Sequence, residues 1–120
     1  MSGKFCVSLT CAKDNADKAT VAFVVANAAI ASDKEALVFL SIEGVNLSQR
    51  GYADSIHEVG FAPLKDLMDS FVQAGGKIYV CSPCFKKRGL DESKLVTGAV
   101  VVGGAKLVEF MGESSPSLSY

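Results

Sequence analysis

Short apolar segments alternate along the chain with longer segments of helical character. Residues 4–9, 35–42, 77–80 and 99–102 are rich in aliphatic, aromatic and β-branched side chains, so we expect each to form a strand. The second of these is almost uninterrupted in its apolar character, which is typical of a parallel strand that is buried on both faces. A short fifth strand is expected at residues 117–120.

The segment between the first two strands predicts a helix. Asp14 or Asn15 can cap a helix that runs to about Ala31, and Asp17 places a negative charge in its first turn. This helix is apolar on nearly all sides from Val21 onward, whereas a helix at a protein surface has a polar stripe. We therefore expect two covers for it, its own sheet and another subunit.

Three further helices are expected. One begins near Pro63 and ends at Gly75-Gly76, because the apolar side chains between them recur at the spacing of one helical face. A short helix capped by an aspartate is expected over residues 92–96, and a longer one over residues 103–111. The apolar face of the first of these helices consists of Leu64, Leu67, Met68 and Phe71.

This alternation predicts one α/β domain over residues 1–120, with a mainly parallel sheet and helices on both faces. In such sheets ligands bind outside the carboxyl ends of the strands, near the point where the strand order reverses. Residues 43–60 show no clear period, and connections of that length are usually functional or interface elements. We therefore expect chemistry at the carboxyl edge of the sheet.

Composition narrows the possible functions. The chain has 120 residues, of which 49% are hydrophobic, and its net charge is -1, so it can bury one core and is not a disordered chain. The basic run Lys86-Lys87-Arg88 is too short for a nucleic-acid surface, and residues 19–31, the longest uncharged apolar stretch, are too few to span a membrane. The residues before the first strand do not have the pattern of a signal peptide, so we expect a cytoplasmic protein with reduced thiols and no nucleic-acid partner.

Three of the four cysteines follow the carboxyl ends of predicted strands. Cys11 follows the first strand, and Cys81 and Cys84 form a Cys-Ser-Pro-Cys motif after the third. If those two strands are neighbours, the three thiols lie at one edge of the sheet. Cys6 lies inside the first strand, where a small buried side chain is wanted. Cysteines in a reducing compartment are more often catalytic, redox-active or metal-binding than structural.

The Cys-Ser-Pro-Cys segment has features that favour a reactive thiol. Pro83 can start a turn of helix that directs backbone N–H groups toward Cys81, and the basic run adds positive charge within one or two turns. Both effects predict a lowered pKa and a nucleophilic thiolate at Cys81. Cys84 can act as a resolving thiol or form a reversible disulfide. Glu43, at the end of the second strand, can face the same edge.

Structural interpretations of these residues stay open. Cys81 and Cys84 can be buried small side chains without chemistry, and the basic run can be a solvated surface. A zinc site needs about four ligands, and only Cys11 and His57 can add to the pair, so we expect no resident metal and no other cofactor. His57 lies in the long connection and is more typical of a solvated or hydrogen-bonding residue than of an acid–base catalyst.

The order of these features resembles the DsrE/DsrF-like family of small sulfur-handling proteins. The resemblance covers nearly the whole chain, and no single piece of it is decisive. The matching parts are the first strand followed by Asp14 and the alanine-rich helix, the Phe-Leu-Ser-Ile-Glu-Gly-Val segment at residues 39–45, Gly75-Gly76 before residues 77–81, Arg88-Gly89, and the terminal residues 118–120.

The resemblance implies a three-layer, doubly wound α/β fold with a five-stranded, mainly parallel sheet, in a homo-oligomer that is commonly a trimer or hexamer. It also implies a cysteine at the end of the third strand that accepts sulfur as a persulfide, and Cys81 falls on that position. The best-studied members relay sulfur in oxidative sulfur metabolism or in tRNA thiolation, often with sister subunits. They carry one cysteine at that position, so Cys84 departs from their pattern.

Three functions remain as hypotheses. The first is a persulfide sulfur carrier or sulfurtransferase-like protein, with Cys81 as acceptor, Cys84 as resolving thiol, and separate donor and acceptor proteins. The second is a thiol–disulfide redox protein or sensor that uses the Cys81–Cys84 pair. The third is a non-catalytic, oligomeric subunit for small-ligand binding or assembly. Cys11, Glu43 and the basic run are accessory candidates in the first two.

Overall fold

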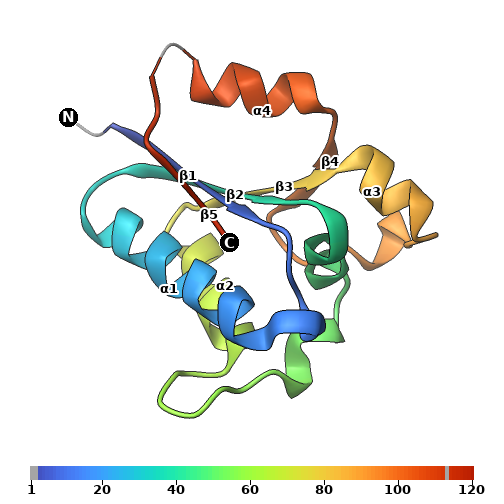
Figure 1. The fold of residues 1–120 in the computed structure, drawn as a ribbon. Coiled ribbons are helices and arrows are strands. Elements are labelled where there is room, and N and C mark those ends of the chain that lie inside the picture. Colours follow the sequence, from blue (N-terminus) through green and yellow to red (C-terminus); the bar gives the residue numbers. More distant parts are fainter. Residues whose placement is uncertain (1–2, 113) are drawn as a thin grey trace.

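The computed structural model describes residues 3–112 and 114–120, which form a five-stranded sheet with helices on both faces (Figure 1). The strand order is β4-β3-β2-β1-β5, and each neighbouring pair is parallel. The five predicted strands are confirmed, although the second ends two residues earlier than expected. The strands are β1 (Lys4–Leu9), β2 (Glu35–Leu40), β3 (Lys77–Cys81), β4 (Ala99–Val102) and β5 (Ser117–Ser119).

The α-helices are α1 (Ala16–Ala31), α2 (Leu64–Gln73), α3 (Ser82–Lys87) and α4 (Gly104–Met111) in the described part of the chain. Asn15 caps α1, because its side-chain oxygen accepts a hydrogen bond of 3.1 Å from the Lys18 N–H. The helix expected at residues 92–96 is only a 3-10 turn, η4 (Glu92–Lys94). The long connection contains two more such turns, η2 (Ile42–Ser48) and η3 (Tyr52–Ser55), and η1 (Lys13–Asn15) precedes α1.

Helices α1 and α2 cover one face of the sheet and pack against each other (Figure 1). The ring of Phe23 in α1 meets the ring of Phe71 in α2 edge to face, with 5.9 Å between ring centroids. The Asn27 side chain donates a 3.0 Å hydrogen bond to the carbonyl of Leu67. The second cover expected for α1 is therefore α2 of the same chain, and the apolar character of α1 gives no argument for a partner subunit.

Helix α4 covers the opposite face of the sheet (Figure 1). Phe110 of α4 packs with Cys6, Leu37 and Phe39, and its ring lies 6.5 Å from the ring of Tyr79, measured between centroids. These strand residues alternate with those that face α1 and α2, as the two-residue period of a strand requires. None of the helices in the described ranges is both long enough and apolar enough to cross a membrane.

The chain leaves the neighbouring strands β3 and β4 in different directions. Phe85 of α3, which follows β3, packs into the larger core beneath the sheet, whereas Phe110 of α4, which follows β4, packs into the smaller core on the other face. A crevice at the carboxyl ends of such strands is the usual ligand site of a doubly wound sheet. The fold therefore directs attention to the ends of β3 and β4.

Candidate functional site

Cys81 is the last residue of β3 and lies at this point of the sheet. Its backbone pairs with that of Val102, the last residue of β4. Its side chain is partly buried and contacts both cores, and it immediately precedes α3. The sequence-based placement of Cys81 at the carboxyl edge of the sheet is thus matched by its position in the structure.

Cys84 lies in the first turn of α3, where Pro83 supports the start of the helix, as the sequence indicated. The pKa of the Cys81 thiol is nevertheless raised, mainly because burial removes water from the charged form. The backbone N–H of Cys84 acts in the opposite direction and lowers the pKa of Cys81, while the Cys84 side chain raises it. Burial outweighs the N–H contribution, so the predicted lowered pKa is wrong.

The basic run does not contribute a charge to Cys81. Lys86 and Lys87 lie in the last turn of α3 and are exposed, and no cation is among the causes of the shifted pKa of Cys81. Solvent and salt screen the electrostatic effect of exposed charges, so a short separation along the sequence is not enough for these lysines to lower the pKa of Cys81. These two lysines therefore fit the alternative of a solvated surface.

Arg88 is held by Glu43, so two accessory candidates meet. The Arg88 Nη2 and Nε donate to Glu43 Oε2 at 2.7 and 3.0 Å, and Nη1 donates to the Cys84 carbonyl at 3.3 Å. Asn46 donates to the other Glu43 oxygen at 3.1 Å. This network ties the end of α3, the helix that carries Cys84, to η2.

Cys11 is not a neighbour of the Cys81–Cys84 pair. Strand β2 lies between β1 and β3, so the condition for three adjacent thiols fails. The segment η2 packs closely on the end of β1: a Cβ atom added at Gly44 would collide with the carbonyl of Leu9. Among the residues that the structure describes, no three His, Cys, Asp or Glu side chains are grouped so that they could hold a metal ion.

Two other candidates have structural roles. His57 is exposed, and its Nε2 lies 2.9 Å from the carbonyl oxygen of Phe61, in agreement with the hydrogen-bonding alternative. Cys6 is 2% exposed in the smaller core, and burial raises the pKa of its thiol. The prediction that Cys6 is a core residue is confirmed.

One residue at this edge was not indicated by the sequence. Ile42 follows β2 and has a φ of 55°, a left-handed conformation that is strained for a β-branched residue. Its side chain is 51% exposed. Strained residues cluster at functional sites. Here the left-handed conformation of Ile42 turns the chain from β2 into η2, which carries Glu43. Only glycine or asparagine in the sequence would have signalled such a conformation.

Comparison with known proteins places this geometry in context. Residues 4–118 match the model of the DsrE/DsrF-like family. The uncharacterized protein MJ0989 of Methanocaldococcus jannaschii is 30% identical over 98% of this chain and 99% of its own length. The uncharacterized protein MJ0760 of the same organism is 29% identical over 82% of this chain, which spans only 36% of that relative.

Solved structures show the same fold. The ychN protein from E. coli covers 100% of both chains with a TM-score of 0.72 at 14% identity. Protein MTH1491 of Methanobacterium thermoautotrophicum, described as a protein of unknown function, also covers 100% of both chains, with a TM-score of 0.68 at 16% identity. At these identities the likeness shows the doubly wound fold and no more.

Proposed function

Because the chain belongs to the DsrE/DsrF-like family, we propose that it is a cysteine-persulfide sulfur carrier, or sulfurtransferase-like protein, in which Cys81 accepts the sulfur. The observation that carries the proposal is the place of Cys81 at the carboxyl end of β3, where the chain leaves β3 and β4 toward opposite faces. The same position holds the sulfur-accepting cysteine that the family resemblance implies. The Cys81 side chain is partly exposed, so a donor can reach it.

The transfer needs one nucleophilic displacement in each direction. The Cys81 thiolate attacks the outer sulfur of a donor persulfide, the S–S bond of the donor breaks, and the donor leaves as a thiolate. Cys81 then carries the added sulfur as a persulfide. An acceptor thiolate attacks that outer sulfur, and Cys81 leaves as a thiolate. One sulfur atom moves, and no external oxidant or reductant is consumed.

Cys84 offers a second exit from the persulfide. Its thiolate can attack the inner sulfur, the Cys81 Sγ, which forms a Cys81–Cys84 disulfide and releases hydrosulfide. A dithiol reductant then returns both cysteines to the reduced form. Cys84 is suited to this step because it lies in the first turn of α3, directly after Cys81, and influences the pKa of the Cys81 thiol. In this role Cys84 discharges the carrier when no acceptor is present.

The short spacing of Cys81 and Cys84 at the start of α3 favours one alternative, a thiol–disulfide redox protein or sensor. Two thiols that lie within one helical turn of each other can form a disulfide without the transfer of a sulfur atom. Titration against glutathione separates the two. The redox function predicts a reversible disulfide with a defined potential and no stable sulfane sulfur, whereas the carrier retains transferable sulfur.

The cellular setting is part of the proposal. The thiol chemistry requires a reducing compartment such as the cytoplasm, with donor and acceptor proteins that carry the sulfur to and from Cys81. We also propose a homo-oligomer, a trimer or hexamer, in which a second subunit covers the apolar side chains of Val100 and Val108. These are 53% and 67% exposed. Light scattering on the eluate of a sizing column measures the subunit number.

Intact-mass spectrometry after incubation with sodium polysulfide tests the sulfur-carrier function. We expect an added sulfur atom on the protein, located at Cys81 by peptide mapping, and its transfer to a low-molecular-weight thiol. Cys81→Ser should lose the added sulfur, and Cys84→Ser should retain it for longer. Cys11→Ser is the matched control, a partly buried thiol after another strand. A Cys81→Ser variant that takes up sulfur as well as the unmodified protein would overturn the proposal.

A further inference from the structure

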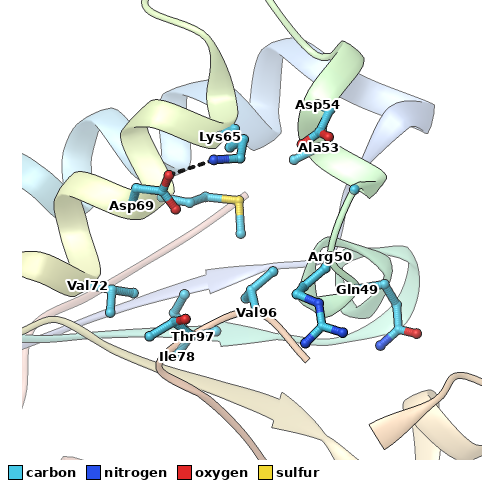
Figure 2. Close-up of a pocket in the computed structure, with 12 residues that line it drawn as sticks. Gln49, Arg50, Ala53, Asp54, Lys65, Asp69, Val72, Ile78, Val96 and Thr97 are labelled. Carbon is cyan, nitrogen blue, oxygen red and sulfur yellow. Dashed lines mark hydrogen bonds and ion pairs between the residues drawn. The ribbon is translucent and has the colours of Figure 1, made fainter. Parts of the chain in front are cut away.

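A cavity of about 370 Å³ lies on the α2 side of the sheet, apart from the thiols (Figure 2). It is enclosed by the segment from η2 to η3, by α2, by β3 and by the stretch before β4. Neither Cys81 nor Cys84 contributes to its lining, and neither do the two residues of the Arg88–Glu43 pair. Its volume is in the range of small-molecule sites in proteins.

The inner part of the cavity is apolar. Met68 and Ile78 are 4% and 0% exposed, and Val72 and Val96 extend the same surface (Figure 2). Such a surface gains free energy when it excludes water against an apolar ligand. It suits a ring system or a branched aliphatic group.

The rim carries a cation, Arg50, that forms no ion pair within the described part of the chain. Lys65 is bound to Asp69 at 2.9 Å, and Arg50 lies across the cavity from this pair (Figure 2). The Arg50 guanidinium forms no ion pair and no hydrogen bond with any of the described residues. Its charge contributes to the lowered pKa of Asp91, an exposed carboxylate that does not line the cavity. A planar guanidinium suits a carboxylate, which it can bind through two parallel hydrogen bonds.

The opposite rim limits the charge of the ligand. Lys65 is paired with Asp69, and the negative charges of Asp69, Asp54 and Asp66 all raise the pKa of its ammonium group. Two of these carboxylates, Asp54 and Asp69, line the cavity. A second negative charge on the ligand would meet this acidic side. The rim therefore favours a ligand with a single negative charge near Arg50.

We propose that this cavity binds a small monoanionic carboxylate with an apolar body, aromatic or branched, whose carboxylate lies on Arg50 and whose body lies on Met68, Val72, Ile78 and Val96. The site is separate from the sulfur chemistry, so the two can fail independently. Cys81→Ser is expected to leave binding in the cavity unchanged.

The probe for this site is 2-naphthoate, titrated into the protein while methyl resonances are followed by NMR. We expect saturable shifts at Met68 and Ile78. Arg50→Gln should weaken binding by about tenfold or more, because a hydrogen-bonded charge pair is lost. Lys94→Gln is the matched control, since Lys94 is an exposed cation outside the cavity lining, and it should bind like the unmodified protein.

Three results would overturn the proposal. The first is no saturable shift at millimolar 2-naphthoate. The second is equal affinity for 2-naphthylmethylamine, which has the same ring and the opposite charge. The third is binding that neither Arg50→Gln nor Val96→Phe changes, where Val96→Phe fills the cavity. Arg50 is exposed, so Arg50→Gln is expected to fold, and thermal melting checks this for both variants.

Discussion

The Arg88–Glu43 pair is predicted to stabilise the protein as a coupled unit. Arg88 is only 19% exposed at its side chain and Glu43 is 43% exposed, whereas the pair Lys65–Asp69 on α2 is 56% and 53% exposed. Arg88 directs two donors at one carboxylate oxygen, and a third donor holds the Cys84 carbonyl. The perturbation is Glu43→Gln, Arg88→Met, and both together.

The expected magnitude follows from burial and from the number of hydrogen bonds. An exposed pair four residues apart on a helix contributes about 0.3–0.5 kcal/mol. Hydrogen bonds that involve a charged group contribute about 1.5–3 kcal/mol when they are shielded from water. Arg88 is shielded and Glu43 only half so, and we therefore expect a coupling free energy of about 1–2 kcal/mol for this pair.

Urea denaturation of the four proteins of this double-mutant cycle measures the coupling free energy. The same cycle on Lys65 and Asp69 is the control, with Lys65→Gln and Asp69→Asn. The coupling of the control pair should also fall further at high salt, because exposed charges are screened more strongly. If the coupling of Arg88 and Glu43 is no larger than that of the control pair, the argument from burial fails.

Two further predictions concern the same edge of the sheet. The rate at which iodoacetamide alkylates Cys81, located by peptide mapping, should keep rising with pH beyond the ordinary cysteine pKa of about 8.5, since only the thiolate reacts and burial raises the pKa of Cys81. Cys84→Ala should move this rise to lower pH, because the variant removes the side chain that raises the pKa and keeps the N–H that lowers it. An unchanged or higher midpoint would contradict this prediction. Ile42→Gly should raise the free energy of unfolding, measured by urea denaturation, by about 1 kcal/mol, because glycine adopts a φ of 55° without strain and the lost side chain is 51% exposed. A loss of stability would show that Ile42 is not strained.

The alternation of strands and helices could be predicted because it depends on local properties. The β-branched and apolar runs at β1 to β4, the Asn15 cap and the apolar face of α2 are each set by a few neighbouring residues. Helix α1 shows the limit of this reasoning. Its apolar sequence required a second packing partner besides the sheet. The local sequence could not show whether that partner was α2 of the same chain, which contributes Phe71, or another subunit.

The candidate site divides in the same way. The sequence by itself determined that Cys81 ends a strand and that Cys84 follows one helical turn later, since both depend on spacing along the chain. Only the tertiary structure decided the pKa of Cys81, the partner of Arg88, the separation of Cys11 and the cavity beside Arg50. The physical reason is that desolvation, ion pairing and enclosure depend on atoms that are distant along the chain, and the packing of the sheet brings those atoms together.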